Sequence, residues 1–192
     1  RLLDGTLGYL TKRIDRTSEG GKIPMEDMCQ LTERQTEYKH KSSYEQIAKT
    51  IAKYSYAPLL DLTDFYEQEF FSWLVGNNDM HLKNFSLYAP KGKWSLTPAY
   101  DLLNVSMVNP KDTEELALTL NGRKKRIKKS DFVSAMTLSG ISPKVFENML
   151  EKHRKHLPKF YDMIDMSFLD DESKKAYKQG ITSRLESMSA QK

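Results

Sequence analysis

Residue types that could carry phosphoryl-group chemistry crowd into one short segment of the chain. Asp79, His81, Lys83 and Asn84 lie within six positions, and Asp101 follows further along. In kinases, one Asp accepts the proton of the substrate hydroxyl, while an Asn five positions later and a second Asp hold Mg²⁺ on the nucleotide. Phosphoryl transfer depends mainly on positioning and charge neutralisation, so these few residue types suffice. The pattern of Asp79, Asn84 and Asp101 therefore favours a kinase-type site.

A β-hairpin is predicted between Asn84 and Asp101. Phe85–Ala89 and Trp94–Pro98 alternate apolar and polar residues around a Pro-Lys-Gly-Lys turn. If the last residue of the first strand pairs with the first residue of the second, Asn84 falls opposite Ala99, and Asp101 lies just beyond. Opposite Cβ atoms in an antiparallel pair are about 4.5–5.5 Å apart. The hairpin is therefore expected to bring an amide oxygen and a carboxylate together, and these are ligands suited to Mg²⁺.

The same residues also fit a structure without chemistry. Asp79 would then be a loop residue after a helix, and Asp101 would cap the next helix in an Asx-rich turn. An Asp and an Asn at this spacing recur by chance in many proteins, so the spacing alone leaves both interpretations open. The apolar helix before Asp79, the hairpin and the returning Asp101 make the catalytic interpretation more specific.

Apolar periodicity predicts that helices form the body that positions this segment. The most apolar helix is expected to begin after Asp61 as N-cap and to be central. Its buried stripe is Leu62, Phe65, Tyr66, Phe70, Trp73 and Leu74. Further helices are expected after Ser43, Ser130 and Ser142, and over about 172–188. The sequence therefore predicts a mainly α fold with small β elements.

Two short strands and one short helix are predicted besides the hairpin. Gly8–Asp15 contains strand-forming residues, and Leu116–Leu120 is predicted as a strand turned by Asn121-Gly122. Pro24 is expected to open a short helix as its first residue.

The sequence around the candidate site resembles the HipA family of bacterial serine/threonine kinases, which are toxins of toxin–antitoxin pairs. The family signature, D-x-H-x-K-N-F-S followed by L-T-P-x-Y-D, is matched by Asp79–Ser86 and Leu96–Asp101. Further matching segments are Lys12–Arg16, Met25–Gln30 and Leu116–Gly122. The resemblance runs from about Tyr9 to the end of the chain. It implies a protein-kinase-like C-lobe, a helical bundle with a catalytic-loop β-hairpin.

The resemblance also implies a role for each residue of the site. Asp79 would be the catalytic base, and Asn84 and Asp101 would be the Mg²⁺ ligands. The residues implied to bind ATP are Lys12, Arg13, Ile14, His81, Lys83, Asn84, Tyr100 and Asp101. The first three would pass the adenine, mainly through backbone groups, and Lys12 stands where the family often has an acidic residue. The alternatives are packing that shapes the loop for His81 and an ordinary surface position for Lys83.

The whole chain, 1–192, resembles the family's C-terminal kinase lobe, with 1–16 as the hinge-strand region. This machinery also needs a lid over the phosphates and a lysine on an upper strand. The sequence has no G-x-G-x-x-G, no P-loop and no strand of the V-A-I-K kind, and it begins with Arg1. We therefore expect the N-lobe to lie upstream in the same protein or in a separate chain. We also expect these 192 residues to bind ATP poorly and to be inactive alone.

The net charge of +4 comes from one segment, Arg123–Lys129, in which six of seven residues are basic. The rest of the chain sums to 4 − 6 = −2. Such a run is usually a solvated loop. The alternatives are contact with DNA phosphates beside an antitoxin, and docking of an acidic or RNA-bound substrate. The resemblance implies a DNA-binding antitoxin as partner and a protein Ser or Thr as substrate, with aminoacyl-tRNA synthetases as the kind of target.

Composition excludes a protein held together by internal disulfides and a protein that spans a membrane. The chain is about one domain long, and its 39% apolar and 29% charged residues are typical of soluble globular proteins. The single Cys29 cannot form an internal disulfide and fits a reducing compartment. No apolar stretch approaches the ~20 residues of a membrane span. These features predict a cytoplasmic protein without a membrane partner.

Two rival functions fit part of the pattern. Small-molecule phosphotransferases of the aminoglycoside-kinase type share the spacing of Asp79 and Asn84, and a substrate screen would separate the two classes. A pseudokinase-like module that binds a DNA-binding antitoxin would need no catalysis. The intact set of Asp79, Asn84 and Asp101 argues against that second rival.

Overall fold

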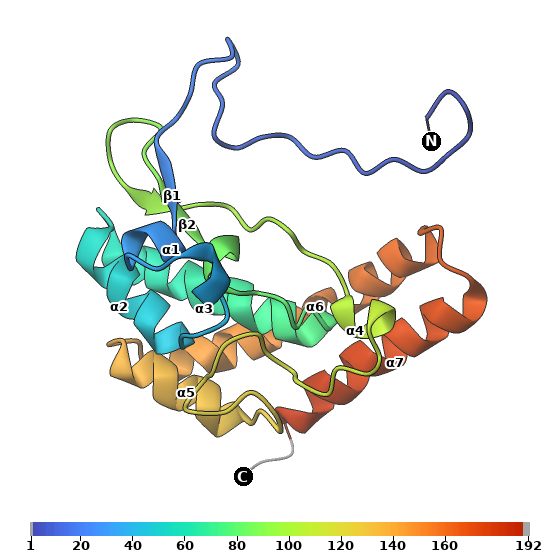
Figure 1. The fold of residues 1–192 in the computed structure, drawn as a ribbon. Coiled ribbons are helices and arrows are strands. Elements are labelled where there is room, and N and C mark those ends of the chain that lie inside the picture. Colours follow the sequence, from blue (N-terminus) through green and yellow to red (C-terminus); the bar gives the residue numbers. More distant parts are fainter. Residues whose placement is uncertain (1, 190–192) are drawn as a thin grey trace.

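Helices form the body of the protein in the computed structural model, which describes residues 2–189 (Figure 1). The ends of the predicted domain, Arg1 and 190–192, lie outside the described residues. The α-helices are α1 (Met28–Leu31), α2 (Tyr44–Tyr54), α3 (Pro58–Val75), α4 (Val105–Val108), α5 (Lys129–Leu138), α6 (Pro143–Asp165) and α7 (Asp171–Ser187). The 3₁₀ helices are η1 (Thr36–Tyr38) and η2 (Leu82–Asn84), and the strands are β1 (Met25–Asp27), β2 (Ser86–Tyr88) and β3 (Ser95–Leu96). This arrangement confirms the prediction of a mainly α fold with small β elements.

Helix α3 is central, as its apolar stripe predicts. It packs against α2, α5 and α7 and against β3. All six predicted stripe residues are buried. The prediction that Asp61 caps this helix is wrong, because α3 begins one turn earlier at Pro58. Pro is favoured at the first helical position, and the Asp61 carboxylate instead accepts hydrogen bonds from Leu96 N and Ser55 Oγ.

The hairpin register predicted from the sequence is confirmed. Strands β2 and β3 pair antiparallel, with Leu87 opposite Leu96. The sheet gains a third strand on its other edge, because β1 pairs with β2. The prediction that Pro24 opens a helix is therefore wrong. Residues 25–27 join the sheet first, and α1 begins only at Met28, where the Asp27 side chain caps it.

Two predicted strands do not form. Residues 8–13 make no β ladder and run as an extended, exposed arm away from the body (Figure 1). A strand gains its stability from a paired neighbour, and the described part of the chain has only an isolated bridge between Arg16 and Lys22 near this arm. Leu116–Leu120 likewise makes only isolated bridges. The predicted Asn121-Gly122 turn is present, with positive φ at both residues.

The remaining helix predictions are confirmed except for one cap. Ser43 and Ser142 accept hydrogen bonds from backbone N–H groups of α2 and α6, and α7 closely matches the predicted last helix. Ser130 lies inside α5, because that helix begins one residue earlier. There the carboxylate of Asp131 accepts a hydrogen bond from Lys128 N over 2.9 Å and takes over the capping role.

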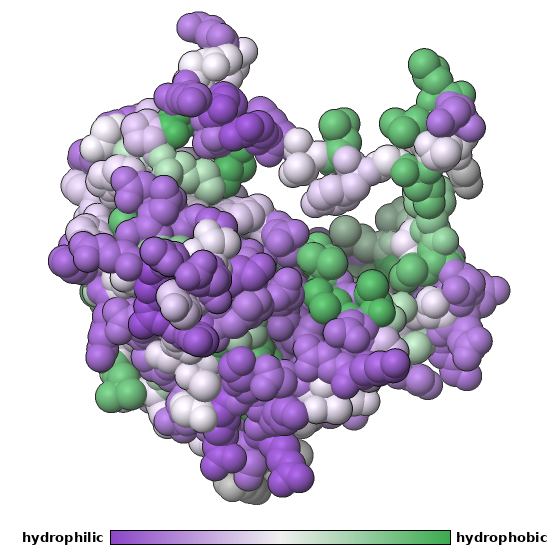
Figure 2. Space-filling view, viewed as in Figure 1, coloured by the Kyte–Doolittle hydropathy of each residue, from purple (hydrophilic) through white to green (hydrophobic). Residues whose placement is uncertain are grey.

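Exposed apolar side chains gather on one part of the surface (Figure 2). They belong to the N-terminal arm, to the segment that leads into α4 and to the end of α4 itself: Leu2, Leu3, Leu7, Leu10, Leu102, Leu103 and Val108. No helix in the described part of the chain is both long and apolar enough to span a membrane.

Candidate active site

The loop after α3 is fixed by a glycine and an asparagine. Gly76 ends the helix with φ +82, and a Cβ there would lie 2.4 Å from Ser106 Oγ, so only glycine fits. Asn77 is buried and bonds both sides of the site. Its Oδ1 accepts a hydrogen bond from Asp79 N over 3.3 Å, and its Nδ2 donates to Asp101 O over 3.1 Å. One side chain thus links the backbones of Asp79 and Asp101.

The hairpin brings Asn84 and Asp101 together, as its register predicts. Asn84 Nδ2 donates to Asp101 Oδ2 over 3.0 Å and to Asp79 O over 3.3 Å. Asp101 has φ +57, a left-handed conformation that Asp tolerates better than most residues. Asn84 therefore contacts both other members of the predicted set, Asp101 through its carboxylate and Asp79 through its backbone carbonyl.

Asn84 and Asp101 carry the kinds of oxygen atom that Mg²⁺ binds. Asn84 uses its amide nitrogen for the contacts within the protein, which leaves its Oδ1 as an acceptor. The side chain of Asp101 is exposed and supplies carboxylate oxygens. Carboxylate and amide oxygens are the ligands that Mg²⁺ takes beside substrate phosphates.

Tyr100 ties the end of the hairpin to the catalytic loop. Its hydroxyl donates to Lys83 O over 2.8 Å and lies 2.6 Å from Ser86 Oγ, which therefore donates to it. Burial raises the pKa of Tyr100 to about 12, so the hydroxyl keeps its proton and its role as a donor. These contacts limit the freedom of the adjoining Asp101.

A groove of about 540 Å³ begins at this end of the hairpin. Its lining includes five of the residues that were predicted to bind nucleotide, namely Lys12, Arg13, Ile14, Tyr100 and Asp101. The sequence separates the first three from the last two, yet the fold places them along one groove.

The side chain of Arg13 is already engaged beside this groove. Its guanidinium donates to Asp15 from Nε over 2.8 Å and from a terminal nitrogen over 2.6 Å. The hydrogen bond from Arg13 lowers the pKa of Asp15 to about 2. The contact with Asp15 occupies two of the five N–H donors of the guanidinium.

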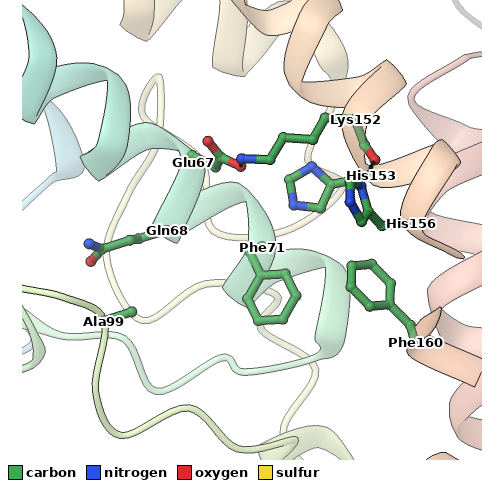
Figure 3. A pocket seen from close by; sticks show the side chains of 8 residues that line it. All are labelled: Glu67, Gln68, Phe71, Ala99, Lys152, His153, His156 and Phe160. Carbon is green, nitrogen blue, oxygen red and sulfur yellow. Dashed lines mark hydrogen bonds and ion pairs between the residues drawn. The ribbon is translucent and has the colours of Figure 1, made fainter. Parts of the chain in front are cut away.

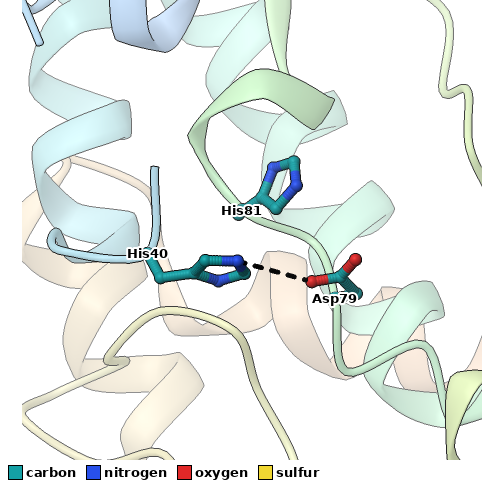
Figure 4. Close-up of side chains that lie close together, drawn as sticks. All are labelled: His40, Asp79 and His81. Atoms are coloured by element: carbon teal, nitrogen blue, oxygen red, sulfur yellow. Dashed lines mark ion pairs between the residues drawn. The ribbon is translucent and has the colours of Figure 1, made fainter. Parts of the chain in front are cut away.

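Asp79 lies beside two imidazoles (Figure 4). His40 Nε2 is 3.8 Å from Asp79 Oδ1, and the rings of His40 and His81 meet edge to face with centroids 4.9 Å apart. Burial lowers the pKa of both histidines, which favours their neutral form. About half of the Asp79 side chain is exposed, so its carboxylate remains open to a substrate.

The ammonium group of Lys83 pairs with Asp27, a residue to which the sequence assigned no role. Lys83 Nζ lies 2.6 Å from Asp27 Oδ2, and the hydrogen bond with Asp27 raises the pKa of Lys83. Asp27 also caps α1 through Gln30 N. Three of the residues predicted to bind ATP, His81, Lys83 and Asn84, are not among the described residues that line the groove of Tyr100 and Asp101.

A second hollow, of about 320 Å³, lies between α3 and α6 (Figure 3). Ala99 lines both hollows, so this one adjoins the candidate site. Its walls are largely Phe71, Phe160 and a buried His153, and an ion pair joins Glu67 to Lys152. Its lining also holds a carboxylate and an amide, but Glu67 is the partner of Lys152, and the Gln68 amide nitrogen donates to Thr97 O over 3.0 Å.

The basic run is partly neutralised by its surroundings. Arg123, Lys124 and Lys129 each lie within ion-pair distance of an acidic side chain, respectively Asp131, Glu114 and Glu147. The neighbouring Glu115 accepts hydrogen bonds from backbone N–H groups of the run. Half of the six cationic side chains are therefore paired within the chain, which weakens the run as a polyanion site.

Comparison with known proteins decides the family. The family model for the HipA-like C-terminal domain matches residues 1–173. The chain belongs to the HipA-like C-terminal domain family. A relative from Sinorhizobium fredii, "Putative kinase Y4dM", is 30% identical over 171 residues, which cover 80% of this chain and 41% of the relative. A "Putative kinase" from Haemophilus influenzae is 42% identical over 65 residues, 33% of this chain and 19% of the relative.

Solved structures share the fold of this HipA-like domain. HipA of Shewanella oneidensis, in a complex with HipB and operator DNA, superposes with a TM-score of 0.78 at 20% identity and covers 92% of this chain and 47% of that one. The Helicobacter pylori proinflammatory kinase CtkA gives 0.55 at 15% identity, over 87% of this chain and 66% of that one. The predicted kinase-like C-lobe fold is thus confirmed. The chain spans less than half the length of the curated relatives it matches.

Sequence reasoning missed several residues that shape the site of this HipA-like domain. The sequence assigned no role in the site to His40, Asp27 or Asn77. His40 is 39 positions from Asp79, so no local pattern could have joined them. Asn77 carried a signal, because two asparagines directly precede Asp79 and asparagine side chains commonly bond backbone groups of tight loops.

Proposed function

We propose that this HipA-like domain is the C-lobe of a serine/threonine protein kinase that transfers the γ-phosphoryl group of ATP to a protein hydroxyl. The observation that carries the proposal is the contact of the Asn84 amide with both the Asp79 carbonyl and the carboxylate of Asp101, a residue that lines the groove. An Asx-rich turn without chemistry would not require a groove at that point.

Each member of the catalytic set has one task. The exposed Asp79 carboxylate takes the proton from the substrate hydroxyl as its oxygen attacks the γ-phosphorus. The bond to the β-phosphate oxygen breaks, and ADP leaves with the bonding electrons. Asn84 Oδ1 and Asp101 would hold Mg²⁺, which neutralises the charge on the phosphates. Tyr100 and Asn77 fix Asp101 and the loop around these groups.

ATP would lie with its adenine along the arm at Lys12, Arg13 and Ile14. Contact there would be made mainly by backbone groups, because Arg13 already pairs with Asp15. His81 and Lys83 would act next to the phosphates only after they leave the partners they hold here. In the present arrangement they shape the loop and brace α1.

A covering lobe and other partners complete the proposal. The exposed arm and the exposed apolar residues before and within α4 are surfaces that an N-lobe would bury. The chain would then be inactive alone and would act as the toxin of a toxin–antitoxin pair with a DNA-binding antitoxin in the cytoplasm. The substrate would be a protein Ser or Thr, with aminoacyl-tRNA synthetases as the first candidates.

The test measures transfer from radiolabelled ATP to protein, in this chain and in a longer chain that carries a phosphate-covering lobe. We expect transfer only in the longer chain, label on Ser or Thr, and loss of Mg²⁺-dependent ATP binding in Asp101→Asn. Asp165→Asn, which removes a surface ion-pair carboxylate on α6, is the matched control and should behave as wild type. Label on an aminoglycoside but not on protein, or unchanged ATP binding in Asp101→Asn, would overturn the proposal.

A further inference from the structure

Three side chains with metal-binding atoms converge on the mouth of the candidate site. The ligand atoms of His40, Asp79 and His81 all lie within 4.8 Å of one another (Figure 4). His40 comes from the loop between η1 and α2, while the other two come from the loop between α3 and η2. None of the roles proposed above uses His40.

The two loops that carry these ligands are tied together. Leu82 N donates to Lys39 O over 3.2 Å, next to two of the ligands in the sequence. Tyr44 Oη donates to Met80 O over 3.0 Å in a buried position. His81 is itself buried, whereas about half of each of the His40 and Asp79 side chains is exposed. The framework is thus held in place, and two of its three ligand side chains remain free to adjust.

The spacing is close to that of a coordinated ion. Tetrahedral coordination with bonds near 2.1 Å puts ligand atoms about 3.4 Å apart. His40 Nε2 and Asp79 Oδ1 are already 3.8 Å apart. Rotation of the exposed His40 and Asp79 side chains can shorten this distance to that of coordinated ligands. Lys83 N donates to His81 Nδ1 over 3.3 Å, a long hydrogen bond that metal binding at the ring would replace.

We propose that His40, Asp79 and His81 form a binding site for a Zn²⁺-class transition metal ion, distinct from the Mg²⁺ site of Asn84 and Asp101. Two imidazoles and one carboxylate suit Zn²⁺ or Co²⁺, whereas Mg²⁺ prefers oxygen ligands throughout. The fourth coordination position faces solvent, because Asp79 and His40 are exposed there.

Occupancy of this site would inhibit phosphoryl transfer, and this consequence rests on the proposed function. A carboxylate oxygen of Asp79 that is bound to a metal ion cannot accept the substrate proton. The metal would therefore act as an inhibitor that competes for the base, while Mg²⁺-ATP remains bound elsewhere.

The direct test is metal binding to the chain itself, without any activity. Co²⁺ is titrated and followed by its visible absorption, and Zn²⁺ is then added to displace it, with Mg²⁺ present throughout. We expect one ion per chain in wild type. Loss even of groups that merely orient ligands changes metal affinity by about 10–100-fold, so His40→Ala should weaken binding at least about tenfold. His156→Ala, which removes a partly buried histidine on α6 outside the proposed site, is the matched control and should bind as wild type.

Equal binding by wild type and His40→Ala, or no binding by wild type, would overturn the metal site. The inhibitory role is tested separately in the active protein. There Zn²⁺ should inhibit wild type at least about tenfold more strongly than His40→Ala, in line with the expected change in metal affinity. Binding without inhibition would overturn the link to Asp79 as base, while leaving the metal site intact.

Discussion

Glu69 is a buried carboxyl group that the fold leaves without a hydrogen bond. It lies on α3 and is fully buried, and neither of its side-chain oxygens has a partner among the described residues. Burial, followed by repulsion from Glu45, raises the pKa of Glu69 well above its usual range. We predict that Glu69→Met, which keeps the volume and removes the polar atoms, increases the stability of the domain.

The magnitude follows from the unsatisfied group. A buried polar group without a partner costs about 1–3 kcal/mol, and a change of 1 kcal/mol shifts the melting temperature of a domain this size by about 2–4 °C. Glu69→Met should therefore melt about 2–12 °C higher than wild type. The pKa of Glu69 is higher in the folded state than in the unfolded state. The wild type is therefore most stable below about pH 4.5, where Glu69 is neutral in both states, and it loses stability as the pH rises from there through the folded pKa. The advantage of the Met variant should grow with pH, by at most about 1.4 kcal/mol per unit.

Urea unfolding of this chain at several pH values from 4 upward, followed by circular dichroism, measures the effect. Glu37→Met, at an exposed position in η1, is the control and should change the free energy of unfolding by less than about 0.5 kcal/mol. A Glu69→Met chain that is less stable than wild type at pH 7, or an advantage that does not change with pH, would refute the reasoning.

Three further predictions concern the loop and the basic run. Tyr44→Phe leaves the Met80 carbonyl without its buried donor, so we expect a loss of about 1–3 kcal/mol in unfolding free energy, measured by urea, and slower phosphoryl transfer. Lys83→Met should cost less than about 1 kcal/mol in the same assay, because its pair with Asp27 is partly exposed. If the complex with an antitoxin binds DNA through Arg123–Lys129, the three cations of this run that pair with no acid among the described residues predict a salt slope of about −2.7, measured by DNA titration.

Other outcomes would count against these predictions. Full activity and stability in the Tyr44 variant would show that its hydrogen bond does not hold the catalytic loop. A loss of several kcal/mol of unfolding free energy in the Lys83 variant would show that the ion pair with Asp27 stabilises the fold more than its partial exposure predicts. A slope near −5 would mean that all six cations contact phosphates, and a flat response would remove the DNA contact altogether.

Patterns of neighbouring residues predicted the hairpin that carries the site and the helix that supports it. The alternation within the hairpin determined its register, and the register determined that Asn84 meets Asp101. The stripe of α3 likewise predicted its central position, because a helix with so wide an apolar face must be covered on several sides.

Contacts between distant segments were beyond such patterns. Residues 25–27 became a strand because the edge of the hairpin offered them hydrogen bonds, although Pro24 favours a helix start. The arm at 8–13 has strand-forming residues but no described neighbour to pair with. Asp61 was expected to cap α3 and instead bonds Leu96, a partner from β3. His40 lies beside Asp79 because the loop before α2 packs on the loop after α3, and the spacing of residues in the sequence does not indicate such a contact.

The central claim is that Asp79 is the base of a phosphoryl transfer at a site built by Asn84 and Asp101. The most direct measurement compares Mg²⁺-ATP affinity and the rate of transfer to protein for wild type and Asp79→Asn, in the longer active chain. A general base contributes about 10²–10⁴-fold, so transfer should fall by at least about 100-fold while ATP affinity stays within about twofold. Transfer at a rate near that of wild type in Asp79→Asn would contradict the assignment of Asp79 as the base.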